Sequence, residues 1–138
     1  MQTIDIDESF FDLWNCEKKQ LNKSKRIVYP KPKEIWYIKI GVNVGKEIFG
    51  KDGFFRPVLV VSKIGNMFFC LPMTTKGKNL SYCLQLFSVF ESKESYLVIN
   101  QGRTFDTQRF FTKIGKVSLE EFMQIKKLLR LRYFPEAF

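Results

Sequence analysis

The sequence predicts an α+β protein, mainly β, in which a small, curled antiparallel β-barrel has a helix at each end. Two patterns indicate this fold. Short apolar runs alternate with turn residues through the middle of the chain, and both ends show the spacing of amphipathic helices. A length of 138 residues suits one compact barrel domain. We expect residues 1–32 to form an N-terminal helix with a basic linker and residues 33–138 to form the barrel domain.

The N-terminal helix is expected between Asp7 and Asn22. Acidic residues come early in this segment and Lys18 and Lys19 come late, which suits the helix dipole. Four apolar residues fall on one predicted inward face: Phe10, Leu13, Trp14 and Leu21. A lysine-rich stretch with two prolines follows. We interpret it as a solvated connector, with an arm that faces a polyanion as the alternative.

The barrel begins with a strand from Ile35, where Trp36, Ile38 and Ile40 alternate with polar or exposed positions. A glycine-rich loop spans residues 41–55. Further strands are expected over residues 58–61, 67–71, 82–86, 96–99 and 109–116, and the two residues 65–66 are a hairpin turn. Ser118 followed by Glu121 is a capping box that starts the last helix. Its predicted inward residues are Leu119, Phe122, Ile125, Leu128 and Leu129.

Charge and composition narrow the function classes. The formal net charge of +9 favours an anionic partner such as RNA or an acidic protein. No apolar run approaches the roughly 20 residues that span a membrane, and the acidic start does not resemble a secretory signal, so we expect a cytoplasmic protein with no membrane contact. The three cysteines contain no CxxC pair, and we expect Cys70 to be a core residue.

Catalytic chemistry is restricted because the chain has no histidine. Ser-His and Cys-His nucleophilic systems are excluded, and scattered carboxylates make a two-metal site improbable. We therefore expect neither a metal nor a cofactor. RNA cleavage suits the remaining residue types, because the substrate's own 2′-hydroxyl is the nucleophile and a guanidinium can stabilise charge on the phosphate.

Five sequence blocks occur in the order of a known family. They are Glu34-Ile35-Trp36-Tyr37, Asn43-Val44-Gly45-Lys46-Glu47, Phe55-Arg56-Pro57-Val58-Leu59-Val60-Val61, Leu71-Pro72-Met73-Thr74-Thr75-Lys76, and Gln101-Gly102-Arg103-Thr104-Phe105-Asp106-Thr107-Gln108-Arg109-Phe110. Each block is weak alone, but their order and spacing are specific. The set resembles the MazF/PemK family of toxins over about residues 33–131.

The resemblance implies an SH3-like barrel with a C-terminal helix and a metal-independent endoribonuclease that cleaves single-stranded RNA. It also implies a homodimer and an acidic antitoxin as partner. The catalytic residues implied are Arg56, Thr74 and Glu47, with Thr75 as the alternative to Thr74. The implied substrate-binding residues are Thr75, Lys76, Gln101, Arg103 and Asn43.

Some features depart from the family pattern or have a second interpretation. Some relatives have a carboxylate where this chain has Asn100, and the loop before Arg56 is longer here, so the proton acceptor stays open. Arg103 and Asp106 are alternatively an ion pair that braces a turn. Trp36 and Phe55 are either core residues or base-stacking platforms. Two other functions stay open: a protein-binding toxin like CcdB, and an RNA-binding module without catalysis.

Overall fold

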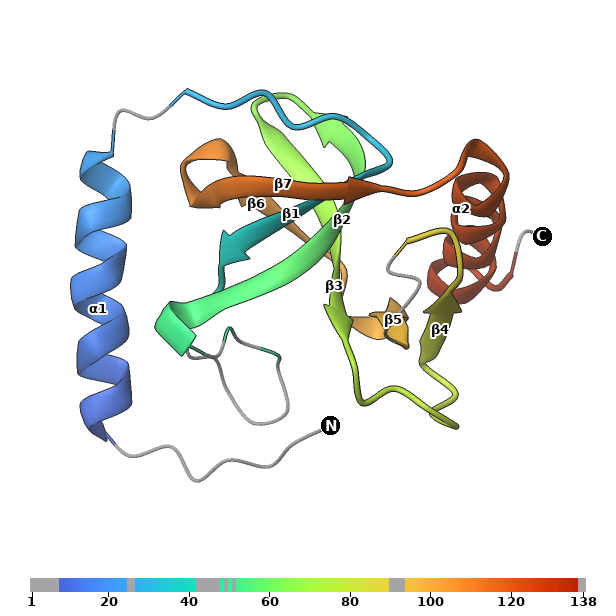
Figure 1. The fold of residues 1–138 in the computed structure, drawn as a ribbon, viewed down its shortest axis with the longest axis horizontal. Coiled ribbons are helices and arrows are strands. Elements are labelled where there is room, and N and C mark those ends of the chain that lie inside the picture. Colours follow the sequence, from blue (N-terminus) through green and yellow to red (C-terminus); the bar gives the residue numbers. More distant parts are fainter. Residues whose placement is uncertain are drawn as a thin grey trace.

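The computed structural model describes residues 8–24, 27–41, 48, 50, 52–89 and 94–136. Its elements are α1 (Glu8–Lys23), β1 (Glu34–Lys39), η1 (Asp52–Phe54), β2 (Phe55–Ile64), β3 (Met67–Thr74), β4 (Cys83–Leu86), β5 (Ser95–Val98), η2 (Ile99–Gln101), β6 (Arg103–Asp106), η3 (Thr107–Arg109), β7 (Phe110–Lys116) and α2 (Leu119–Tyr133). The two α-helices lie at opposite ends of the strands (Figure 1). The predicted α+β class, with a helix at each end of an antiparallel sheet, is confirmed.

The sheet is curled but open. Its strand order is β4-β5-β3-β2-β1-β7, and β6 also pairs with β3. The first half of β3 pairs with β6, from Met67↔Asp106 to Cys70↔Arg103, and its end pairs with β5 at Met73 and Thr74. One edge of β3 thus pairs with β6 along its first half and with β5 at its end, and β4 lies beyond β5. Among the described strands, neither β4 nor β6 pairs with β7 at the opposite edge of the sheet. The closed barrel that we expected is therefore replaced by a strongly bent sheet.

Local turn signals were reliable, whereas one strand was missed. Ile64 pairs with Met67, so residues 65–66 form the predicted two-residue hairpin turn, and Gly65 has a φ of 61° that favours glycine. The strand β6 falls inside the block that begins at Gln101, where the sequence shows no clear alternation. Its pairing with β3 is a long-range contact that local periodicity does not reveal.

One face of the sheet packs inside the curl. Its buried cluster consists of Trp36, Ile38, Ile40, Val58, Val60, Phe68, Cys70, Phe105 and Phe110. Trp36 is a core residue: it is 8% exposed, and its indole N–H donates to the Glu34 carboxylate at 3.0 Å. Cys70 is fully buried, as predicted, and burial raises the pKa of its thiol well above the usual range.

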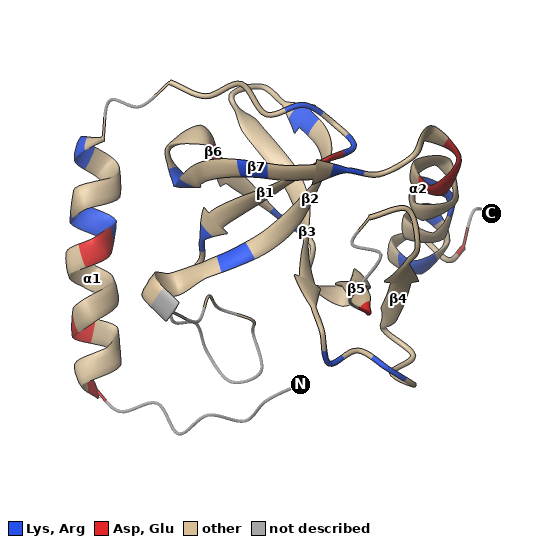
Figure 2. Ribbon diagram, in the orientation of Figure 1, with Lys and Arg blue, Asp and Glu red and all other residues tan. Residues whose placement is uncertain are grey.

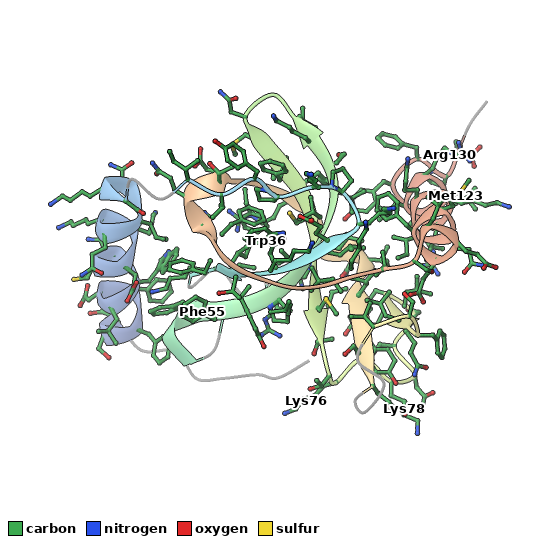
Figure 3. All side chains as sticks on the ribbon, turned by 45° about the horizontal axis from the view of Figure 1, so that its top comes forward. Trp36, Phe55, Lys76, Lys78, Met123 and Arg130 are labelled. Atoms are coloured by element: carbon green, nitrogen blue, oxygen red, sulfur yellow. The ribbon has the colours of Figure 1, made fainter. Side chains whose placement is uncertain are left out.

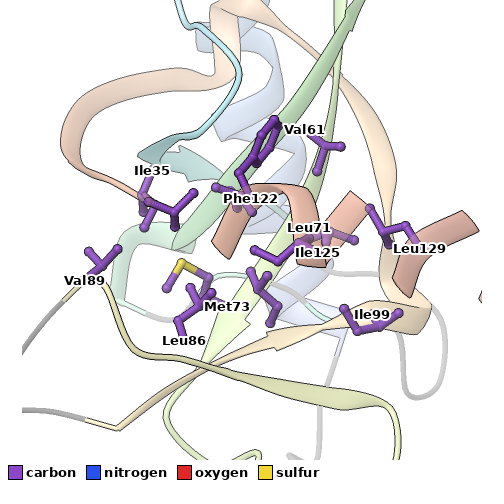
Figure 4. Packing of buried hydrophobic residues seen from close by; sticks show 13 residues of the cluster. Ile35, Val61, Leu71, Met73, Leu86, Val89, Ile99, Phe122, Ile125 and Leu129 are labelled. Carbon is purple, nitrogen blue, oxygen red and sulfur yellow. The ribbon is translucent and has the colours of Figure 1, made fainter. Parts of the chain in front are cut away.

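The other face of the sheet is covered by α2. Phe122, Ile125 and Leu129 of this helix are buried against strand residues such as Leu71 and Met73 (Figure 4). Ser118 caps the helix as predicted, because its hydroxyl accepts from the Glu121 N–H at 3.1 Å. Leu119 was predicted to face inward, and that prediction is wrong.

Leu119 is 61% exposed, and the first turn of α2 contacts the loop after β4. The Glu121 carboxylate, which a full capping box would direct back to the N-cap, instead accepts from the backbone N–H groups of Phe87 and Ser88 at 2.8 and 3.1 Å. The first turn of α2 therefore meets this loop through a polar contact.

The helix α1 packs against the opposite end of the curl. Trp14 and Leu21 are buried with Phe54, and Phe10 and Phe111 pack against them. A Cβ atom added to Gly41 would lie 1.6 Å from the indole of Trp14, so a residue with a side chain would overlap this ring. The inner stripe follows positions 10, 14, 17 and 21. The prediction for Leu13 is wrong: it lies at the edge of the stripe and is 58% exposed.

An ion pair also fixes α1 to the sheet. The Glu17 carboxylate lies 2.5 Å from Lys39 Nζ on β1, and both side chains are largely shielded from solvent. Phe55 stands beside this pair, with Lys39 Nζ 5.0 Å from its ring and Phe111 edge-on to it, so Phe55 serves in packing at this junction. Neither helix of the described chain is long and apolar enough to cross a bilayer.

Candidate active site

Arg56 and Thr74 lie opposite each other on the central hairpin. The register of β2 and β3 pairs Val58 with Pro72, and the same register continued by two residues sets Arg56 opposite Thr74. The guanidinium of Arg56 reaches this point, because Nη1 donates to the carbonyl oxygen of Met73 at 3.1 Å. The structure therefore brings the two residues together, and both side chains are half-buried.

Burial shapes the electrostatics of this pair. Desolvation lowers the pKa of the Arg56 guanidinium below its usual value, yet an arginine stays charged at neutral pH. A cation that has lost part of its water binds an anion more strongly than a fully solvated one, because the effective dielectric constant is lower. Arg56 is thus suited to hold a phosphate at the surface of the sheet.

The hydroxyl of Thr74 is fixed by its own turn. Its oxygen accepts from the Lys76 backbone N–H at 3.1 Å, which is a side chain-to-backbone turn contact. A hydroxyl that accepts one hydrogen bond still has a hydrogen to donate. Thr74 can therefore donate to an oxygen placed between it and Arg56.

A small pocket continues from these residues toward η2 and β6. It has a volume of about 200 Å³ and is lined by Ile48, Pro72, Asn100, Gln101, Gly102, Arg103 and Phe105. Pro72 lines this pocket and also lies beside the Arg56–Thr74 pair. Side chains two positions apart on a strand share a face, so Pro72 is on the same face of β3 as Thr74. Arg56, Thr74, Gln101 and Arg103 thus border one surface.

Gln101 anchors the long loop between β1 and β2. Its side-chain oxygen accepts from the Ile48 N–H at 2.5 Å, across 53 positions of sequence. The contribution that the structure supports for Gln101 is to position this loop, and direct contact with substrate stays a prediction. Glu47 and Asn43 are predicted site residues of the same loop, and both lie outside the described residues.

Arg103 extends from β6 over an aromatic ring. Its guanidinium carbon lies 4.7 Å from the centre of the Phe105 ring, and its side chain is exposed. The alternative of an Arg103–Asp106 ion pair is wrong, because residues three apart on a strand point to opposite faces. Asp106 instead accepts from the Gln108 N–H at 2.9 Å and caps η3.

Thr75 and Lys76 lie on the exposed loop that follows β3. Lys76 and Lys78 extend away from the body of the molecule at this loop (Figure 3). Lys and Arg also occur on β2 and β7, so positive charge extends over the barrel strands beyond this loop (Figure 2). Among the residues that the structure describes, no three Cys, Asp or Glu side chains gather where they could hold a metal ion.

Sequence reasoning missed Tyr133, which supports the site from α2. Its hydroxyl accepts from the Gly102 N–H at 2.9 Å and donates to the Ile99 carbonyl at 2.7 Å. The contact fixes the segment that presents Gln101 and Arg103. Nothing local in the sequence marks Tyr133 for this position, because its partners are more than thirty residues away.

Comparison with known proteins identifies the family. The profile of the family described as "PemK-like, MazF-like toxin of type II toxin-antitoxin system" matches residues 31–132. The chain belongs to this family. The matched region contains all the described strands and α2 up to its next-to-last residue and leaves α1 outside, so the MazF/PemK fold is the curled sheet with its C-terminal helix.

Solved structures of MazF proteins have the same fold. MazF from Deinococcus radiodurans aligns with a TM-score of 0.62 at 15% identity, covering 78% of this chain and 98% of that one. The MazE–MazF complex from the same organism gives 0.59 at 13%, with 78% and 98% covered. An endoribonuclease in complex with its cognate antitoxin from a mycobacterial species gives 0.57 at 11%, with 80% and 99% covered. No curated protein sequence matches the chain significantly.

Proposed function

We propose that this family member is a metal-independent endoribonuclease that acts in the cytoplasm. It would cleave single-stranded RNA with Arg56 and Thr74 as catalytic residues. The observation that favours it is the hydrogen bond of 3.1 Å from Arg56 Nη1 to the Met73 carbonyl, which holds a desolvated guanidinium against the end of β3, where the register sets Arg56 opposite Thr74. Such a pair matches the two donors that a phosphodiester needs when charge develops on its non-bridging oxygens.

The proposed reaction is an internal transesterification. The 2′-hydroxyl oxygen of one nucleotide attacks the adjacent phosphorus, and the bond from phosphorus to the 5′-oxygen of the next nucleotide breaks. The products are a 2′,3′-cyclic phosphate and a 5′-hydroxyl. Arg56 would stabilise the charge on the phosphorane-like transition state and protonate the leaving 5′-oxygen. Thr74 would donate to a non-bridging oxygen and hold the phosphate in line.

The proton of the 2′-hydroxyl needs an acceptor. The family resemblance proposes Glu47 as this acceptor or as a residue that orients Arg56, and Asn100 cannot replace it because an amide is not a base. Glu47→Gln should separate these roles. If Glu47 is the base, the cleavage rate of the unchanged protein should fall as the pH is lowered, because the carboxylate becomes protonated. The residual rate of the variant should not show this fall.

The test is the incubation of the purified protein with a defined single-stranded RNA in excess EDTA, with the fragment ends mapped. Arg56→Ala and Thr74→Val should each reduce the cleavage rate by roughly 10²–10³-fold, the usual cost of one lost transition-state donor. Lys63→Ala removes an exposed cation from the same strand and is the matched control. Thr74→Ser, which retains the hydroxyl, should keep most of the activity.

Three outcomes would contradict the proposal. Cleavage that survives in both Arg56→Ala and Thr74→Val would remove this site. Salt-sensitive RNA binding with intact RNA would indicate a binding module without catalysis. Stimulated gyrase cleavage complexes without RNA fragments would indicate a toxin that acts like CcdB. Melting temperatures of all variants show whether lost activity reflects lost folding.

We also propose an acidic antitoxin as partner and a homodimer as the active form. The net charge of +9 and the solved complexes of family members with their antitoxins support the first. Exposed apolar side chains on α2, including Met123 at 62% exposure, are compatible with a protein contact; Met123 extends outward from the helix (Figure 3). Light scattering on the purified protein, alone and with the candidate antitoxin, measures both.

A further inference from the structure

A second pocket lies between α1 and the sheet and shares only Arg103 with the pocket described above. Its volume is about 320 Å³, and it is lined by Phe11, Trp14, Asn15, Lys18, Gly41, Arg103 and Arg109. We call it the α1 pocket. Four of its lining residues come from α1, which precedes the part of the chain that matches the family. The pocket is therefore an addition of this chain to the family fold.

The wall that α1 supplies is held in place. Trp14 packs directly on Gly41 and lies 5.2 Å from the Phe54 ring, centre to centre. The Glu17–Lys39 ion pair fixes the next turn of the helix. Phe11, Asn15 and Lys18 stand at positions 4, 8 and 11 of α1, so they share one side of the helix beside this anchored stripe.

The pocket is strongly basic. The guanidinium carbons of Arg103 and Arg109 lie 4.7 and 5.7 Å from the centre of the Phe105 ring. Burial and the charge of Arg103 both lower the pKa of Arg109, whereas Asp106 opposes this shift. Within the described part of the chain, no carboxylate forms an ion pair with Arg103, Arg109 or Lys18. Two guanidinium groups and an ammonium group therefore share this pocket.

Its other side chains suit a nucleobase. Phe11 is 46% exposed and offers a ring face, and Asn15 offers an amide that can pair with a base edge. Arg109 is already fixed: it donates to the Lys39 carbonyl at 3.2 Å and lies 5.6 Å from the Trp14 ring centre. Lys18 and Arg103 are the exposed cations that remain for a phosphate.

Arg103 connects this pocket to the candidate active site, because it lines both the α1 pocket and the pocket beside Pro72 and Gln101. We propose that the α1 pocket binds one nucleotide of the RNA strand that flanks the scissile phosphate, with Lys18 and Arg103 on a phosphate and Phe11 stacked on the base. This inference rests on the RNA cleavage proposed above. It assigns to α1 a part in substrate binding.

The experiment measures binding to a 2′-O-methyl oligonucleotide, which cannot be cleaved, by fluorescence anisotropy with the full chain. Phe11→Ala should weaken binding roughly tenfold, as expected for the loss of one stacked base. Lys18→Ala should weaken binding and reduce the slope of log K against log salt concentration by about 0.7, the value for one phosphate contact on a single strand. Leu13→Ala and Lys19→Ala remove exposed α1 side chains outside the pocket and should change nothing.

The outcomes separate the two proposals. If the unchanged protein cleaves RNA but Phe11→Ala and Lys18→Ala bind as tightly as their controls, the α1 pocket inference is overturned and the cleavage proposal stands. If the protein binds the oligonucleotide with the expected losses but cleaves nothing, the pocket is supported and the cleavage proposal fails. If the variants lose affinity for an acidic peptide and not for the oligonucleotide, the pocket is a protein site and the inference is overturned.

Discussion

The phenol of Tyr133 and the backbone N–H of Gly102 meet at 2.9 Å, which joins the end of α2 to the turn that leads into β6. The same hydroxyl donates to Ile99 at 2.7 Å. Gly102 fits here because it has no side chain: an added Cβ would lie 2.5 Å from the Phe69 ring. The C-terminal helix thus fixes the residues on either side of Gly102, which are Gln101 and Arg103.

Tyr133→Phe tests this connection. The variant loses two hydrogen bonds and leaves the Ile99 carbonyl and Gly102 N–H without this partner, so we expect a loss of about 1–2 kcal/mol in the free energy of unfolding. RNA cleavage should fall several-fold, because Arg103 and Gln101 lose their support. Urea denaturation and cleavage rates measure the two effects. Tyr29→Phe alters a tyrosine that is 77% exposed and serves as the control; equal behaviour of the two variants would contradict the role of Tyr133.

Glu34 should make stability depend on pH. Burial acts to raise the pKa of its carboxyl, but hydrogen bonds from Lys113, Trp36 and the Lys31 backbone, with the charge of Lys113, lower it below the usual 4.5. A lowered pKa in the folded state means that the stabilisation is fully present above pH 4.5 and is lost as the pH falls through the folded value.

Glu34→Gln should therefore flatten the stability profile on the acid side. Urea denaturation between pH 7 and the acid limit of the fold should show a steeper loss in the unchanged protein than in the variant. Glu120→Gln, an exposed carboxylate on α2, is the control and should follow the unchanged protein. A profile of Glu34→Gln that is parallel to the unchanged one would show that this carboxylate does not contribute.

The three thiols should react in order of exposure. Cys16 is exposed, Cys83 is intermediate and Cys70 is buried, and desolvation raises the pKa of both Cys83 and Cys70. Because the thiolate is the reactive form, iodoacetamide at neutral pH should label Cys16 first and leave Cys70 unmodified until the chain unfolds. Mass spectrometry of peptides over time measures the order. Rapid labelling of Cys70 in the native protein would be incompatible with its place in the core.

Gly41→Ala should detach α1 and leave the sheet folded. The added methyl group would occupy the position of the Trp14 indole, and no rotation of a surface side chain can relieve this overlap. We expect faster amide exchange and proteolysis of residues 8–23 and little change in the strands. Gly115→Ala is a milder comparison, since its nearest contact is 3.0 Å from Val89. Protection of α1 that is equal to that of the unchanged protein would show that the helix does not depend on this contact.

Signals from residues close together in the sequence predicted much of the fold correctly. The turn at Gly65 and the cap at Ser118 depend on residues close in sequence, and both were predicted correctly. The exposed Leu13 and Leu119 were predicted to be buried, because periodicity gives the apolar face of a helix but not how far its packing surface extends. The division of β3 between β5 and β6 also depends on long-range pairing.

The candidate site was predictable only in part. Arg56 and Thr74 were selected through the family resemblance, and the register of the hairpin places them opposite each other. Roles for Thr75, Lys76 and Asn43 as substrate contacts stay predictions. Tyr133 and the α1 pocket could not be found from the sequence, because each arises where segments remote in the chain meet.

The register of β3 has a consequence for tolerance to insertions and deletions. Thr74 faces Arg56, while its neighbour Met73 is buried beneath α2. One residue added or removed between the hairpin turn and Thr74 would reverse these two positions, and the hydroxyl would point into the hydrophobic layer. Single-residue insertions or deletions in this segment should therefore abolish the site even where the sheet still folds.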